Sequence, residues 1–127
     1  MSYSTVLVVD DEVEVCRILD RMLSNDHCRV QTSHSVADAV AAIEEEPFDL
    51  YVLDYKLRDG CGLDIADRVR SKGSQAPIIL LSGYVPAEIA LRSQKLRILE
   101  TIEKPFSREM IVNAVKKAIG SLERVLA

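Results

Sequence analysis

Four short apolar runs of the sequence each end in charged or hydroxyl side chains. Asp10-Asp11 follow the first run, Asp54 follows a second, Ser82-Gly83 a third and Lys104-Pro105 a fourth. Each group alone is weak evidence, because acidic residues after a strand commonly start a helix or a turn. Three carboxylates, a hydroxyl and an ammonium gain meaning only if the fold brings them to one place.

Together, these groups have a coherent chemistry. Clustered carboxylates repel one another and need a cation, and a few hard oxygen ligands plus water suit Mg²⁺. An aspartate can attack phosphorus and form an acyl phosphate. Phosphoryl transfer also needs cations and hydrogen-bond donors around the transferred group, which Lys104 and Ser82 can supply.

The elements that must position these groups alternate between two patterns. Strand-length apolar runs span 6–9, 50–53 and 78–81, and they are unbroken, as expected of strands buried on both faces. Residues 28–33 alternate between polar and less polar side chains, which predicts an edge strand, and the mixed segment 98–102 predicts the other edge.

Between these strands the apolar residues recur with helical spacing. We expect buried helical stripes at Val15, Ile18, Leu19 and Met22; at Val36, Ala39, Val40 and Ile43; at Leu63, Ala66 and Val69; and at Met110, Ile111, Ala114, Val115, Ala118, Ile119 and Leu122. Ser35 and Ser107 are candidate N-caps, Pro47 follows the second helix, and Pro86 is expected to open a short fourth helix.

Strands alternating with helices predict an α/β fold, a flavodoxin-like (βα)5 doubly wound parallel sheet with strand order 2-1-3-4-5. In such sheets ligands bind outside the carboxyl ends of the strands. All four polar groups stand at such ends, so we expect them to converge on one edge.

Composition excludes several other classes of protein. The 127 residues fit one domain, and an apolar content of 48% is that of an ordinary globular protein. No apolar run approaches the roughly 20 residues of a membrane span, and the polar start is no signal peptide. A formal charge of −4 argues against nucleic-acid or membrane binding. Three cysteines without a CxxC pair indicate cytosolic thiols used in packing.

The chain resembles the receiver domain of two-component response regulators over nearly its whole length. The resemblance rests on VLVVDDE at 6–12, the lone Asp54, Ser82 followed by the small Gly83, and KPF at 104–106. It implies a single receiver domain over 1–127, in a bacterial cytoplasmic signalling protein that is not an enzyme in its own right.

The resemblance also implies a role for each site residue. Asp54 would accept the phosphoryl group, while Asp11, Asp54 and the backbone carbonyl of Lys56 would bind Mg²⁺, with Asp10 acting through water. Lys104 would hold one phosphoryl oxygen. Ser82 would move to bond another, shifting the loop that begins at Gly83.

Three further positions are expected to tune or transmit the signal. Lys56 and Tyr84 occupy positions that set the phosphoryl lifetime in the family. Thr101 stands where most members have an aromatic residue that reports the state. Arg58, a further departure from the family, stands where a proline is common.

The implied partners are a histidine kinase or histidine phosphotransfer protein upstream, and a partner protein or fused effector domain downstream. A phosphorylation-dependent homodimer is a further expectation. The alternative is a degenerate receiver that serves only for docking or dimerisation. An aspartyl phosphatase would need an Asp-x-Asp pair on the first strand, and a P-loop protein would need GxxxxGK[ST], and neither motif is present.

Overall fold

Five parallel strands form the central sheet. The computed structural model describes residues 3–83 and 86–126, with side chains through residue 120. The strands are β1 (Ser4–Val9), β2 (Cys28–Ser33), β3 (Leu50–Asp54), β6 (Ile78–Ser82) and β7 (Glu100–Glu103). Their order is β2-β1-β3-β6-β7. Because β6 and β7 are the fourth and fifth strands of the sheet, this confirms the predicted order and the flavodoxin-like fold.

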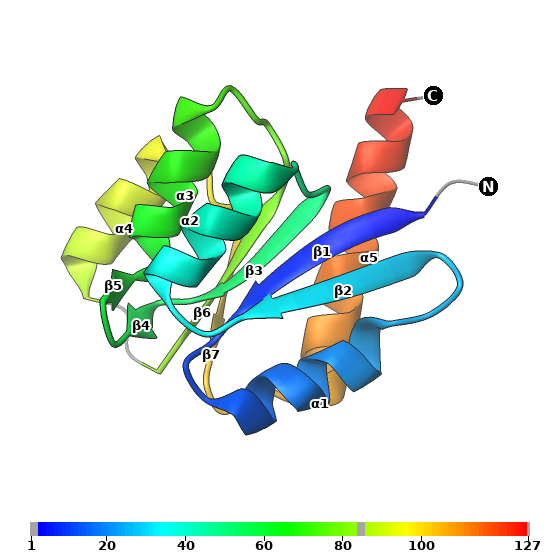
Figure 1. Ribbon diagram of the computed structural model, residues 1–127, viewed down its shortest axis with the longest axis horizontal. Coiled ribbons are helices and arrows are strands. Elements are labelled where there is room, and N and C mark those ends of the chain that lie inside the picture. Colours follow the sequence, from blue (N-terminus) through cyan, green and yellow to red (C-terminus); the bar gives the residue numbers. More distant parts are fainter. Residues whose placement is uncertain (1–2, 84–85, 127) are drawn as a thin grey trace.

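Helices cover both faces of the sheet (Figure 1). They are α1 (Val13–Leu23), α2 (Val36–Glu45), α3 (Gly62–Ser71), α4 (Ala87–Lys95) and α5 (Arg108–Leu126). Buried side chains of α2, α3 and α4 pack on one face, and those of α1 and α5 pack on the other. None of the helices in the described part of the chain combines the length and apolarity that crossing a membrane requires.

The central strands are unbroken apolar runs because each contributes to two cores. Along β1, Leu7 and Val9 pack under α2 and α3, whereas Val6 and Val8 pack against α1 and α5. Successive strand residues point to opposite faces, so a strand covered on both sides needs apolar residues at every position. The edge strand β2 instead alternates, with Cys28 buried and Arg29 exposed.

Two residues predicted to be buried are exposed. Ile18 is 48% exposed, because α1 is turned so that Cys16, Leu19 and Leu23 face the sheet. Met110 is 47% exposed, because it lies in the first turn of α5 beside the rim of the sheet. The side chain of Leu122, in the same predicted stripe, lies outside the described residues.

Several boundaries also differ from expectation. The last strand begins at Glu100 rather than Ile98, because Arg97 has a φ of 55° and closes the turn after α4. Pro86 is the N-cap of α4 rather than its first helical residue. The caps Ser35 and Ser107 are confirmed, since their hydroxyls accept from the amides of Asp38 and Met110.

One element had no counterpart in the sequence pattern. A short antiparallel hairpin of β4 (Lys56–Leu57) and β5 (Gly60–Cys61) connects β3 to α3. It lies at the carboxyl edge of the sheet beside the first turn of α2 (Figure 1).

Candidate functional site

Three aspartates converge at the carboxyl edge of the sheet. Asp10 and Asp11 follow β1, and Asp54 ends the adjacent β3, whose Leu53 is in register with Val9. One carboxylate oxygen from each of the three lies within 4.8 Å of the others. Asp10 is 0% exposed and Asp54 is 6% exposed. The topology therefore produces the cluster that the strand ends predicted.

Lys104 provides the positive charge of this cluster. Its Nζ donates to Asp10 Oδ2 at 3.1 Å and lies 3.2 Å from Asp54 Oδ1. The backbone holds the residue in place, because its amide donates to the Ser82 carbonyl at 2.8 Å. The peptide bond to Pro105 is cis. A cation thus links two carboxylates from different strands.

Three groups hold Asp10 in place around its side chain and its carbonyl. The amide of Glu12 donates to Asp10 Oδ1 at 2.9 Å. The Cys16 thiol donates to the Asp10 carbonyl at 3.4 Å, and His34 Nδ1 lies 3.1 Å from the same oxygen. Burial, then the Asp10 charge, raises the pKa of Cys16 to about 11, so the thiol stays protonated and can donate. Cys16 and His34 were not predicted to support the site.

The carboxyl of Asp54 is harder to ionise than an ordinary aspartate. Burial is the main cause, the Asp10 charge adds to it, and Lys104 opposes both, so the pKa of Asp54 rises from 3.8 to about 6. The same carboxylates raise the pKa of Lys104 despite its burial. An additional cation beside Asp54 is therefore electrostatically favourable.

The cluster opens into a hollow of about 540 Å³. The residues that line it are Asp11, Glu12, Asp54, Lys56, Leu57, Arg58, Gly83 and Lys104. Ser82 ends β6 next to the hollow and is 1% exposed. Lys56 and Arg58 are exposed and form no ion pair with any residue that the structure describes. Acids and several cations thus line a space large enough for a phosphoryl group, and the Ser82 hydroxyl is buried at the strand end next to it.

Comparison with known proteins agrees with this geometry. The family model described as "Response regulator receiver domain" matches residues 6–116. The chain belongs to the response regulator receiver domain family.

Full-length relatives of this receiver domain are longer proteins. The response regulator protein PilR of Pseudomonas aeruginosa is 28% identical over 120 residues, covering 91% of this chain and 27% of PilR. The acid tolerance regulatory protein ActR of Rhizobium meliloti is 31% identical over 121 residues, covering 95% of this chain and 61% of ActR. The chain therefore spans between about a quarter and three fifths of these relatives.

A solved structure supports the fold of this receiver domain. The CheY-like receiver domain protein of Methanospirillum hungatei superposes with a TM-score of 0.91, covering 97% of this chain and 98% of that one. Its sequence identity is 23%, so this likeness speaks for the fold alone.

Gly62 lets the receiver's α3 approach the site closely. A Cβ on Gly62 would lie 2.4 Å from the backbone oxygen of Asp54, so a larger residue would displace the strand end that carries this aspartate. The Gly62 amide donates to the Tyr55 carbonyl at 2.8 Å. Sequence reasoning missed this glycine, because only the three-dimensional packing reveals the contact.

One residue expected to tune or transmit the receiver's signal does not line the hollow. Thr101 is exposed on β7, in register with Leu80 of β6. Tyr84 lies outside the described residues.

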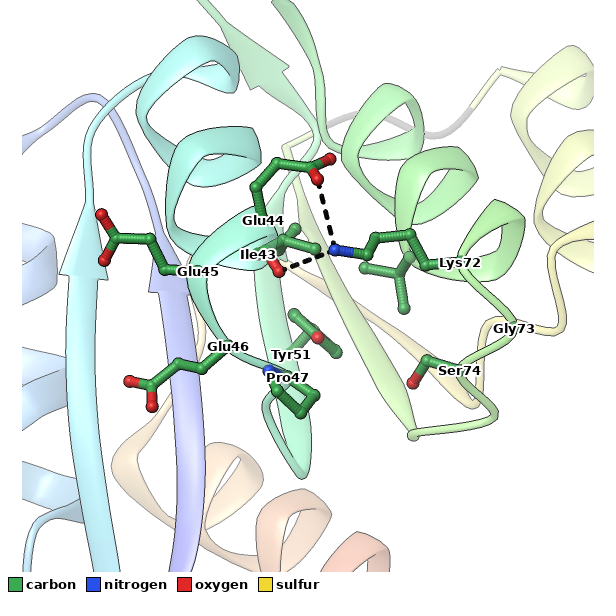
Figure 2. A pocket seen from close by; sticks show the side chains of 10 residues that line it. Ile43, Glu44, Glu45, Glu46, Pro47, Tyr51, Lys72, Gly73 and Ser74 are labelled. Atoms are coloured by element: carbon green, nitrogen blue, oxygen red, sulfur yellow. Dashed lines mark hydrogen bonds and ion pairs between the residues drawn. The ribbon is translucent and has the colours of Figure 1, made fainter.

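A second hollow of the receiver, of about 420 Å³, lies at the opposite end of the sheet between the last turns of α2 and α3 (Figure 2). Across it, Lys72 Nζ donates to the Ile43 carbonyl at 3.2 Å and to Glu44 Oε2 at 3.4 Å. Glu45 and Glu46 point away from Lys72. The aspartate cluster is not among the residues that line this hollow.

Proposed function

We propose that this receiver domain accepts a phosphoryl group on Asp54. The observation that carries the proposal is the convergence of Asp10, Asp11 and Asp54 around Lys104 at the mouth of one hollow. A carboxylate of β3 that faces the hollow can act as the nucleophile toward phosphorus. Lys104, already 3.2 Å from Asp54 Oδ1, can hold a phosphoryl oxygen and balance its charge.

Mg²⁺ is the proposed cofactor of this reaction. The donor set fits it, since three carboxylates supply hard oxygens within 4.8 Å of one another. Asp11, Asp54 and the Lys56 carbonyl would hold the ion, and Asp10 would act through water. The ion would supply charge neutralisation for the phosphoryl oxygens. In the protein itself, Lys104 keeps Asp10 and Asp54 aligned.

The proposed consequence is a switch. Phosphorylation replaces one negative charge by roughly −1.5 to −2 and adds acceptor oxygens. Ser82 is buried beside the site, and its movement toward the new acceptor would carry Gly83 and the loop after β6. One charge-assisted hydrogen bond of ~1.5–3 kcal/mol is enough to shift a two-state equilibrium about tenfold to a hundredfold.

Lys56, Tyr84 and Thr101 are the proposed tuning residues. Lys56 lines the hollow and forms no ion pair with any residue that the structure describes, so its ammonium can cover the phosphoryl group against attacking water. Thr101 offers an exposed hydroxyl where an aromatic is usual. The output of the switch therefore depends on a polar surface at β7.

The proposed upstream partner is a histidine kinase or histidine phosphotransfer protein, and the downstream partner is a protein or a fused effector domain. Longer relatives such as PilR support a fused effector. The proposal places the protein in the cytoplasm and assigns it no catalysis beyond its own phosphorylation and dephosphorylation. Free thiols at Cys16, Cys28 and Cys61 agree with that compartment.

Acetyl phosphate labelling tests the proposal. The wild type should gain one phosphoryl group in Mg²⁺ and none in EDTA, measured by intact-mass spectrometry, and Asp54→Asn should gain none. Asp20→Asn, at a half-buried aspartate of α1 outside the hollow, is the matched control and should label normally. A folded wild type that neither labels nor binds Mg²⁺ would instead identify a docking module.

A further inference from the structure

The hairpin that carries Lys56 is fastened at its tip to a different helix. Asp59 lies in the turn between β4 and β5. Its Oδ1 accepts from the Val36 amide at 2.8 Å, and its Oδ2 accepts from the Ala37 amide at 3.0 Å. These are the first two amides of α2, which have no partner within the helix.

The two caps of α2 divide its free amides between them. Ser35 accepts from the Asp38 amide at 3.0 Å, as a local N-cap does. Asp59 serves the preceding two amides from 22 and 23 residues further along the chain. The helix end is therefore also an anchor for the hairpin, and the amides lower the pKa of Asp59.

The base of the hairpin is held independently. The Tyr55 amide donates to the Leu81 carbonyl at 2.7 Å, and Cys61 N donates to Asp64 Oδ2 at 2.9 Å. Gly60, with φ of 154°, passes so close that a Cβ there would lie 3.2 Å from Val36 Cγ2. The base of the hairpin is thus fixed to the sheet and to α3, and its tip is fixed to α2. Lys56 lies between these two attachments.

We propose that Asp59 is a positioning residue that sets the Lys56 carbonyl for Mg²⁺, by clamping the hairpin to the N-terminus of α2. The inference rests on the proposed function. Arg58 occupies the position where a proline would stiffen this loop, so the stiffness must come from elsewhere. The Asp59 clamp supplies it through two charge-assisted hydrogen bonds.

A titration with Mg²⁺ alone tests the clamp. Its readouts are the heat of binding, measured by calorimetry, and the amide shifts, measured by NMR. For Asp59→Ala we expect the dissociation constant to rise about tenfold, the low end for partners that orient a metal ligand. Asp59→Asn keeps one acceptor and should show a smaller rise. Ser35→Ala removes a cap of the same helix without touching the hairpin, so its Mg²⁺ affinity should stay within about twofold.

Thermal unfolding of the same variants separates positioning from stability. Both alanine variants should lower Tm, because each leaves amides of α2 without a partner, but only Asp59→Ala should weaken Mg²⁺ binding. Equal Mg²⁺ affinity in Asp59→Ala and wild type would overturn the clamp while leaving the proposed function standing. Equal losses of Mg²⁺ affinity in Asp59→Asn and Asp59→Ala would overturn the clamp, because they would show that the Asp59 charge alone attracts the ion. A wild type that binds no Mg²⁺ would overturn both proposals.

Discussion

Removing the charge of Asp54 should stabilise the metal-free protein at neutral pH. The unfolded chain has the ordinary pKa of 3.8, whereas burial and the Asp10 charge raise the pKa in the fold to about 6. Between these values the folded state binds more protons than the unfolded state, so the free energy of unfolding falls as pH rises. A shift of about two pKa units corresponds to about 3 kcal/mol of unfolding free energy. The protonated Asp54 contributes this stability at low pH, and it is fully lost once the pH exceeds about 6.

Asparagine is the suitable replacement because it has the shape of the protonated carboxyl. Asp54→Asn should therefore exceed the wild type in unfolding free energy by up to about 3 kcal/mol at pH 8. The difference should vanish near pH 4, where the wild-type carboxyl is protonated in the fold. Lys104 retains its 3.1 Å contact with Asp10, so the substitution leaves its ammonium paired.

Urea unfolding in EDTA at pH 4, 6 and 8 measures this difference. Asp26→Asn, at an exposed aspartate in the turn before β2, is the matched control and should show no pH-dependent gain. A variant less stable than the wild type at pH 8, or a gain that persists at pH 4, would refute the reasoning. Saturating Mg²⁺ should reduce or reverse the difference in unfolding free energy between Asp54→Asn and the wild type. The ion stabilises only the protein whose site is intact.

Three more substitutions test contacts that hold the site or the fold around it. Gly62→Ala should cost about 1–3 kcal/mol of stability in thermal unfolding and reduce acetyl phosphate labelling, because its Cβ would meet the backbone of Asp54. Arg70→Met should cost about 2–4 kcal/mol of stability in urea unfolding, because its guanidinium donates to four backbone carbonyls. The control Arg17→Met removes an exposed ion pair and should cost under about 1 kcal/mol. Lys104→Met should raise the pKa of Asp54 beyond about 6, measured by carboxyl ¹³C NMR, because the substitution removes the opposing charge.

The architecture was predictable because burial on two faces leaves a plain trace in sequence. Val6–Val9 and Ile78–Leu81 are unbroken apolar runs, and a chain that alternates such runs with helical stripes has few possible topologies. The topology then placed Asp10 and Asp54 on adjacent strands without any local signal that they meet. Prediction of the cluster therefore depended on prediction of the sheet.

Helix rotation was less predictable, since a stripe of apolar residues is wider than the face that a helix buries. Ile18 and Leu19 both fit the period of α1, yet only Leu19 faces the sheet. The choice depends on the neighbouring α5, with which α1 shares its core. No local pattern contains that information.

The residues that support the site were hidden for a different reason. Cys16 and His34 act on the carbonyl of Asp10, and Asp59 acts on the amides of α2, so each pairs a side chain with distant backbone. Backbone groups are the same at every position and leave no mark in the sequence.

The support of the Lys56 hairpin shows what such hidden pairs accomplish. A proline would restrict the loop by fixing one φ angle within it, an effect that acts locally. The Asp59 clamp restricts it by joining it to α2, so the loop and the helix must move together. A change at Asp54 that displaces Lys56 would then also shift the start of α2. A loop stiffened by proline would not be coupled to that surface. Amide shifts of Val36 and Ala37 on adding Mg²⁺, present in the wild type and absent in Asp59→Ala, would demonstrate that connection.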